Sequence, residues 1–309
     1  MFAGICAIVC CSVLLGTVPS LQNLLRSEGY SIATMNLFIN ILETTFLFAV
    51  CKVTKRDIRV TKKQLLQLAL CGFFGVGATS MLLNNAYQRI SVGLATMVHF
   101  LYPTMVCVYM SVFRRERFTK FRALAVAASI GGMAMLCGGI SSGPNALGIV
   151  FALSSTLSYG FYVIANGSGD IADMNVFVKP MYIYLFSSIE MLALVLCTGG
   201  IQRPAFQPWH VPMFALVAVC FSVAASCIAF SIRRIGSAAT SFFNMLEPVV
   251  SFVVSAVFFH DAITWEMLLG CGLVLCAVAL ITTDQRMAAK TPAPVRAGTA
   301  PAGKQPKRV

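Results

Sequence analysis

Apolar residues gather in ten blocks along the chain, and short polar spacers separate one block from the next. Each block has roughly the 20 residues that a helix needs to cross the hydrocarbon core of a bilayer. No block alternates apolar and polar residues as a transmembrane β-strand requires. The pattern therefore predicts an all-α integral membrane protein. The ten expected transmembrane helices are residues 2–23, 32–52, 65–87, 92–113, 122–140, 147–166, 178–198, 212–232, 238–259 and 265–283.

The composition agrees with this prediction. The chain is 58% hydrophobic and 11% charged, whereas soluble domains average about 25% charged residues. The first block has the length of a signal peptide but no basic segment before it, so we interpret it as the first helix. Residues 284–309 are rich in Ala, Pro, Gly, Lys and Arg. This composition predicts a disordered basic tail.

Basic residues are distributed unequally between alternate spacers. The net charge is +12, and the spacers at 52–63 and 114–122, together with the tail, carry most of the 23 Lys and Arg residues. Of these residues, Arg26, Arg89 and Arg203 fall on the other side. The positive-inside rule then predicts a multi-pass membrane protein with both termini in the cytoplasm. Because no retention tetrapeptide closes the chain, we expect the plasma membrane. The basic loops are expected to contact lipid headgroups, and nucleic-acid binding has little support.

Nearly all of the twelve cysteines lie inside apolar blocks, where they behave as small hydrophobic residues. The sequence has no CxxC pair and no Cys/His cluster with ligand spacing, so we expect no metal and no cofactor. It also lacks GxxxxGK[ST], the phosphate-binding loop of an ATP-driven pump.

The chain matches itself at an offset of 145 residues. Residues 89–103, RISVGLATMVHFLYP, align without a gap on residues 234–248, RIGSAATSFFNMLEP. Both segments open with Arg-Ile and close with Pro. The same offset is expected to superpose the first helix on the sixth, and so on through the fifth on the tenth. Because each half has an odd number of crossings, the halves are predicted to be inverted repeats, the architecture of secondary transporters.

The residues around both segments resemble the EamA domain of the drug/metabolite transporter superfamily. In the first half these are NNAYQRISVGLATMVHFLYPTMVCVYM, and in the second half AFSIRRIGSAATSFFNMLEPVVSFVVS. The resemblance implies two repeats, 1–140 and 147–283, and an alternating-access carrier of small metabolites, often an exporter. It also implies a cavity lined mainly by helices 1, 3, 4, 6, 8 and 9, with helices 5 and 10 at the periphery.

Three carboxylates, Glu43, Glu190 and Glu247, lie at membrane depth, where a charged side chain costs about 2.5–3.5 kcal/mol on insertion scales. Each should therefore face protein or water. For Glu247 we expect a place in the transport pathway, with a hydrogen-bonded structural acid as the alternative. The helices of Glu43 and Glu190 could serve as scaffold, and their register in the repeat does not match. Functional and structural roles both stay open for these two.

Polar residues form a stripe on the ninth helix. Ser241, Asn244 and Pro248 recur every three or four residues, with Glu247 one step away. The fourth helix has its own set at the corresponding positions, and the symmetry predicts that the two sets meet across the seam. Each proline removes a backbone hydrogen bond and can bend its helix. The set on the fourth helix is Thr96, His99, Tyr102 and Pro103.

Tyr159, Tyr162 and Asn84 are further candidates to bind a substrate. The alternative is that these residues lie near helix ends and meet lipid headgroups. For His99 the alternative is a buried histidine with satisfied hydrogen bonds. We expect no catalytic residue, because the sequence has no HExxH zinc-binding motif, and Ser241 near Glu247 or His99 near Thr96 is only a thin version of a nucleophile with its base.

These features predict a secondary active transporter that moves a small organic metabolite, such as an amino acid or a related amphipathic solute, by alternating access, with export as the expected direction. A membrane-embedded enzyme and a channel are the alternatives. A coupling proton or ion is a further expected partner, with Glu247 as the candidate proton carrier. The sequence leaves a monomer and a homodimer equally open.

Overall fold

The computed structural model describes residues 2–90, 92–114, 118–136, 145–205, 207–258 and 264–290, and the described part is all-helical. Apart from the short η2, the described residues form ten helical segments in the predicted order. Three of them are composite. The elements are α1 (Phe2–Ser27), α2 (Ile32–Val53), α3 (Lys62–Leu70), η1 (Cys71–Gly77), α4 (Ala78–Tyr87), α5 (Val92–His99), α6 (Tyr102–Phe113), α7 (Lys120–Leu136), α8 (Ala146–Asn166), η2 (Gly169–Ile171), α9 (Val178–Cys197), α10 (His210–Ile235), α11 (Ser237–Asn244), α12 (Leu246–Phe258) and α13 (Trp265–Lys290).

Within the described residues, eight of these segments are long and apolar enough to cross a membrane. The third segment consists of α3, η1 and α4, the fourth of α5 and α6, and the ninth of α11 and α12. The prediction of an all-α, multi-pass membrane protein is therefore confirmed.

Local chemistry fixes several helix ends. The side chain of Ser31 accepts a hydrogen bond from the backbone of Thr34 at the start of α2. At α3, Thr61 and Gln64 form a reciprocal capping box. Gly236 has a φ of +82°, and this left-handed residue turns the chain from α10 directly into α11.

The last helix extends beyond its predicted end. α13 continues to Lys290, so residues 284–290, which the sequence assigned to the tail, are helical. Asp284 accepts hydrogen bonds from Thr119 Oγ1 at 2.6 Å and from Arg122 Nε at 3.0 Å. These bonds tie α13 to the start of α7. The rest of the predicted tail, 291–309, lies outside the described residues.

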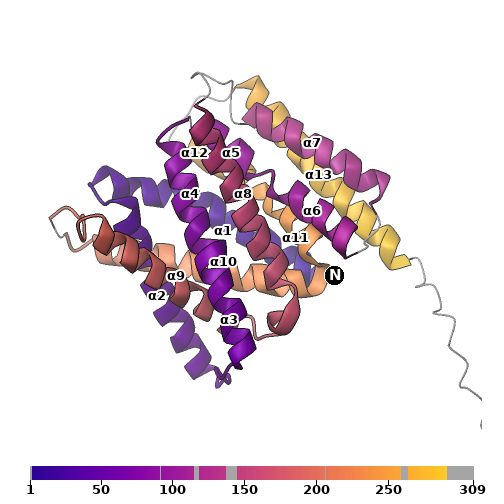
Figure 1. Ribbon diagram of the computed structural model, residues 1–309. Helices are drawn as coiled ribbons and strands as arrows, with labels where there is room; N and C mark the ends of the chain where they lie inside the picture. The colour runs from indigo at the N-terminus through magenta and orange to yellow at the C-terminus, as the bar shows by residue number, and fades with distance from the viewer. Residues whose placement is uncertain are drawn as a thin grey trace, which may run out of the picture.

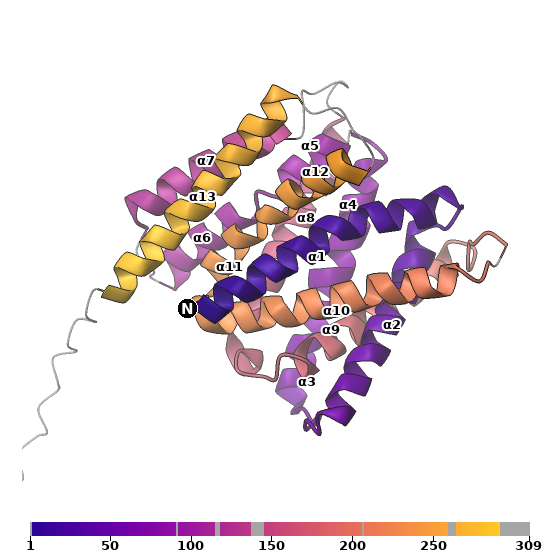
Figure 2. The ribbon, with the colours of Figure 1, turned by 180° about the vertical axis from the view of Figure 1, so that it is seen from behind.

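The two halves interlock rather than pack as separate bundles. α1, from the first half, packs on α10 and α12 of the second, and α8 packs on α4 and α6 in the corresponding way. α2 also packs on α9, its counterpart in the other half, and α7 packs on its counterpart α13. This pattern is that of an approximate two-fold axis between the halves. The α7–α13 pair stands to one side of the bundle in Figures 1 and 2, at the periphery as the resemblance implied.

Two glycines show the repeat at the level of atoms. A Cβ added to Gly4 on α1 would lie 2.8 Å from a side-chain atom of the Arg-Ile pair at 234–235. A Cβ added to Gly148 on α8 would lie 2.7 Å from the Arg-Ile pair at 89–90. Corresponding residues of the first and sixth helices are therefore separated by one residue less than the predicted 145. That single-offset prediction was wrong for this helix pair.

Candidate substrate site

The fourth and ninth segments are both interrupted in the middle. α5 ends at His99 and α6 begins at Tyr102, while α11 ends at Asn244 and α12 begins at Leu246. The two breaks occur at corresponding positions of the repeat. Pro103 and Pro248 follow the breaks, and a proline cannot donate a hydrogen bond to the carbonyl four residues earlier.

Hydroxyl groups from the opposite half contact the backbone at each break. Thr156 Oγ1, on α8, donates to the carbonyl oxygen of Val98 at 2.7 Å. Ser12 Oγ, on α1, lies 3.2 Å from the carbonyl oxygen of Phe243. Ser12 and Thr156 correspond in the repeat at the same offset as Gly4 and Gly148. Each break is thus stabilised by the first helix of the other half.

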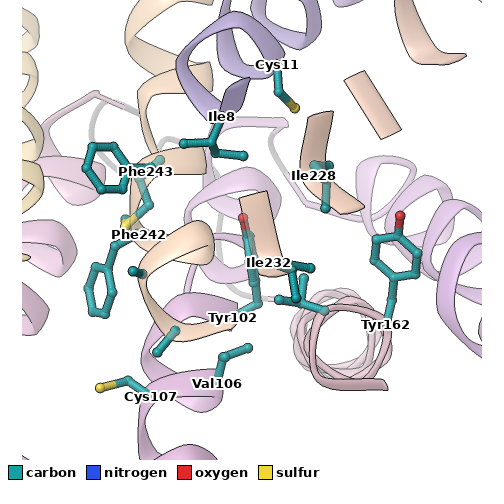
Figure 3. Close-up of a cluster of buried hydrophobic side chains, with 14 of the residues drawn as sticks. Ile8, Cys11, Tyr102, Val106, Cys107, Tyr162, Ile228, Ile232, Phe242 and Phe243 are labelled. Carbon is teal, nitrogen blue, oxygen red and sulfur yellow. The ribbon is translucent and has the colours of Figure 1, made fainter. Parts of the chain in front are cut away.

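A small polar cluster lies where the two breaks meet. Asn244 Nδ2 donates to Tyr102 Oη at 3.1 Å and to Glu247 Oε2 at 3.2 Å, and Cys11 Sγ lies 3.6 Å from Asn244 Oδ1. Figure 3 shows the Tyr102 hydroxyl pointing toward α1, where Ile8 and Cys11 lie. Tyr102, Asn244 and Glu247, three of the predicted site residues, are therefore brought together.

The other predicted residues on these helices have different partners. His99 Nδ1 lies 3.0 Å from Ser155 Oγ on α8, whereas the partners of the Asn244 side chain are Tyr102, Glu247 and Cys11. Ser241 Oγ donates to the carbonyl of Ala238 in its own helix. Thr96 Oγ1 lies 3.4 Å from Tyr87 Oη. Asn84, on α4, does not line the cavity described below.

Tyrosine rings connect the polar cluster to a cavity. The ring of Tyr159, on α8, lies edge-on to Tyr102 at 4.7 Å between centroids and 5.5 Å from Tyr162. Tyr159 and Tyr162 both line the cavity. These two residues were predicted as candidates, and the structure places them between the cluster and the open space.

The cavity has a volume of about 150 Å³ and lies between helices of both repeats. The helices that line it are the first, second, third, sixth, seventh and eighth. The resemblance implied the fourth and ninth helices instead of the second and seventh, and the structure differs on this point. The lining residues are Leu15, Asn36, Ile39, Asn40, Glu43, Val76, Thr79, Ser80, Tyr159, Tyr162, Tyr184, Phe221, Ala224, Ala225 and Ile228.

Glu43 is the acidic residue of this cavity. It is 1% exposed, and its Oε2 atom has no hydrogen-bond partner. One turn earlier on α2, Asn40 Nδ2 donates to Ser187 Oγ on α9 at 2.9 Å. Asn36, Asn40 and Glu43 are spaced by four and three residues, so they lie on one face of α2. That stripe is a signal in the sequence that was missed.

Glu190, on α9, has a different environment. Its carboxyl group packs against Gly77, where an added Cβ would collide with it. Glu190 Oε2 is also buried without a hydrogen-bond partner, but the residue does not line the cavity. The two glutamates each lie three residues after a member of the Asn40–Ser187 pair. They therefore occupy corresponding positions on α2 and α9, a match that the predicted register did not find.

The third segment widens into a π-helix, η1, beside the cavity. Ser158 Oγ, from α8, lies within hydrogen-bond distance of the carbonyl oxygens of Phe74 and Gly75, and Thr79 Oγ1 contacts Ser158 at 2.9 Å. These contacts take up backbone groups that the wider turn leaves poorly paired. π-helical turns are frequent at functional sites, and this one carries Val76 into the cavity wall.

Side chains hold the helices together at the end of the bundle where α8 finishes. Lys179 is fully buried, and its Nζ donates to the carbonyls of Asn166 at 2.9 Å and Ala172 at 3.2 Å. Gln67 Nε2 donates to the carbonyls of Ala165 and Ser168. We call this group of contacts the basic-end closure, because the α2–α3 loop beside it carries the basic residues of 52–63.

The basic-end closure also includes the start of the ninth segment. Ser237 Oγ, at the start of α11, donates to the carbonyl of Val163 on α8 at 3.1 Å. Asn36 and Phe221 of the cavity wall belong to the halves of α2 and α10 that lie away from this end. The cavity therefore reaches toward the opposite end of the bundle.

Comparison with known proteins also divides the chain into two repeats. The EamA-like transporter family matches residues 2–138 and again residues 146–283. The chain belongs to the EamA-like transporter family. It is accordingly a multi-pass membrane transporter and not an enzyme.

Two curated relatives of this EamA transporter match most of its length. An uncharacterized transporter from Archaeoglobus fulgidus is 24% identical over 244 residues, which are 76% of this chain and 83% of the relative. A probable terminal-alkyne amino-acid exporter from Streptantibioticus cattleyicolor is 24% identical over 283 residues, 86% of this chain and 90% of the relative.

A protein of known crystal structure has the same fold. The two structures superpose with a TM-score of 0.75 at 15% sequence identity. The superposition covers 93% of this chain and 99% of the other chain. At this identity the likeness supports the fold alone.

Proposed function

We propose that this EamA transporter is a secondary active carrier that moves a small organic solute by alternating access. The observation that supports the proposal is the cavity between the two repeats, since transporters with inverted repeats bind their substrates at that seam. The basic-end closure would then be one of two alternating seals. Its opening, with closure of the opposite end, would expose the cavity to the other side.

We further propose that the transporter lies in the plasma membrane with both termini in the cytoplasm. The concentration of Lys and Arg in the spacers at 52–63 and 114–122 supports this orientation. The basic-end closure would then be the cytoplasmic seal, and the cavity would reach toward the outside.

For the solute, we propose an amino acid or a related amphipathic molecule, moved by export. A relative bears the name of a probable amino-acid exporter. The cavity wall combines amide and hydroxyl groups with apolar and aromatic side chains, which suits a solute with one polar and one apolar part.

Counterflow in proteoliposomes tests the proposed function. Vesicles with the purified full-length chain are loaded with one unlabelled amino acid or amine and then exposed to the same labelled compound. A carrier accumulates label transiently and saturates with concentration, while a channel equilibrates without overshoot. Uptake without overshoot for every solute that permeates would replace the carrier with a channel.

Glu247 is the proposed proton carrier if transport is coupled to protons, because its carboxyl group is held by Asn244 within the polar cluster. The Glu247→Gln variant keeps a hydrogen-bonding side chain but cannot release a proton. We expect its counterflow rate to lose the pH dependence of the wild-type protein. An unchanged pH profile would remove Glu247 from that role.

A further inference from the structure

The cavity contains a buried acid with no partner. Glu43 lines the wall at 1% exposure, its Oε2 makes no hydrogen bond, and none of the ion pairs among the described residues includes it. An unpartnered carboxyl group in a low-dielectric interior is costly, whether it is charged or neutral. The unpartnered carboxyl group lies in the wall of the cavity that a ligand would enter. This position indicates that a ligand supplies the missing partner.

The charges around the cavity define what this partner is. No Lys, Arg or His is found among the described residues that line it. The buried Lys179 on α9 is engaged elsewhere, because its Nζ donates to the carbonyls of Asn166 and Ala172 in the basic-end closure. Asn40 is also engaged, by Ser187. Among the described residues of the wall, the Glu43 carboxyl group therefore has no counter-charge, and a cationic donor fits it.

Aromatic rings in the cavity wall also favour a cation. Tyr159, Tyr162 and Tyr184 line the cavity together with Glu43, and Tyr162 and Tyr184 are 3% and 9% exposed. The faces of tyrosine rings attract ammonium groups, more strongly when water is excluded. The remaining wall is mostly apolar. An engineered apolar cavity of about 150 Å³ is known to hold a benzene ring, so the volume here accommodates a ring-sized apolar group.

We propose that Glu43 binds the ammonium group of the transported solute, and that the solutes are small amines with an apolar or aromatic part, amino acids included. This inference rests on the proposed function and specifies its substrate class. The ammonium group would pair with the free Oε2, the tyrosine rings would surround it, and the apolar part would fill the rest of the cavity.

Binding of matched probes to the full-length protein in detergent tests the proposal by calorimetry. The probes are 2-phenylethylammonium, the neutral 2-phenylethanol and the anionic 3-phenylpropanoate, which share a phenyl group and a short chain. We expect the cation to bind roughly tenfold or more tightly than either of the others. Equal affinity for the cation and the alcohol, tighter binding of the anion, or no binding of the cation would overturn the proposal.

The Glu43→Gln variant then assigns the effect to one side chain. It should weaken binding of the cation roughly tenfold or more and leave the alcohol unchanged. The matched control is Glu190→Gln, which alters the corresponding glutamate outside the cavity and should not change either affinity. Cation binding that survives in Glu43→Gln, or that is lost equally in Glu190→Gln, would contradict the assignment. If Glu43→Gln does not elute as a monodisperse species, protection of Glu43 from carbodiimide by the cation, in wild-type protein, decides instead.

The inference and the proposed function can fail separately. Saturable counterflow confined to neutral or anionic solutes, and unaffected by Glu43→Gln, would support the carrier function and contradict the amine site at Glu43. Charge-selective binding that depends on Glu43, together with passive uptake that shows no overshoot, would support the amine site and contradict the carrier function.

Discussion

At the scale of single residues, buried polar side chains account for the shape of the central helices. Thr156 and Ser12 each contact a backbone carbonyl beside a helix break in the other repeat. Asn244 then joins Tyr102 to Glu247 across the seam. These groups lie deep in the bundle, where a lost partner is not replaced by water.

The Thr156→Val variant should therefore be less stable than the wild type. Removal of the hydroxyl leaves the carbonyl of Val98 with a weaker set of partners, at a cost of about 1–3 kcal/mol. We expect the apparent unfolding temperature in detergent to fall by several degrees. Thr45→Val is the control, since Thr45 is exposed and bonds within its own helix. Equal shifts for both variants would contradict the proposed role of Thr156.

At the scale of elements, close helix packing depends on small residues at particular positions. α7 and α13 pack against each other along their length. A Cβ at Gly132 would lie 2.8 Å from the carbonyl oxygen of Gly270 and 2.9 Å from a methyl group of Val274. A Cβ at the adjacent Gly131 would meet nothing closer than 3.7 Å. Two neighbouring glycines thus face different environments.

The pair Gly132→Ala and Gly131→Ala tests this difference. We expect Gly132→Ala to destabilise the protein by about 1–3 kcal/mol, because the new methyl group separates α7 from α13. Gly131→Ala should be neutral or stabilising by up to about 1 kcal/mol, since alanine favours the helix. Thermal unfolding in the same detergent measures both. A larger loss at Gly131 than at Gly132 would show that the packing of α7 is described wrongly.

The basic-end closure is the element whose opening the carrier needs. In Lys179→Met the two hydrogen bonds to the carbonyls of Asn166 and Ala172 are lost, while the aliphatic volume stays similar. We expect backbone amides of residues 163–177 to exchange hydrogen for deuterium roughly tenfold faster, as for a closure weakened by about 1.4 kcal/mol. Lys52→Met is the control, because Lys52 lies over the exposed Phe48 ring.

An unchanged exchange rate at residues 163–177 in Lys179→Met would mean that Lys179 does not hold the closure. Faster exchange in Lys52→Met to the same extent would mean that the effect is not specific to Lys179.

At the scale of the whole molecule, the sequence predicted the architecture well because the bilayer imposes a fixed length on each helix. The ten segments and the internal repeat were predicted from the sequence, and the outlying position of the α7–α13 pair was implied by the family resemblance. The proline positions also indicated the breaks before Tyr102 and Leu246. The π-helix Cys71–Gly77 was not predicted, because it depends on Ser158 from a distant part of the chain.

The candidate site was predicted only in part, and the reason is physical. Tyr102, Asn244 and Glu247 meet because symmetry relates their helices, and symmetry is visible in the sequence. Glu43 lines the cavity because α2 crosses α9 at the Asn40–Ser187 contact, and that crossing depends on tertiary packing. An offset of 145 residues does not reveal it, since the helix pairs follow slightly different offsets.

Labelling of a cysteine at position 162 from each side of the membrane tests the central claim most directly. The Tyr162→Cys variant is made in a background whose native cysteines are replaced, and a membrane-impermeant maleimide is added to either face. We predict labelling from both faces. A cross-link between Gln67→Cys and Ser168→Cys should then abolish labelling from the basic face alone. Leu157→Cys, exposed on the outer surface of the same helix, should stay unlabelled. Labelling from a single face, or labelling from the basic face that persists with the cross-link in place, would contradict alternating access through this cavity.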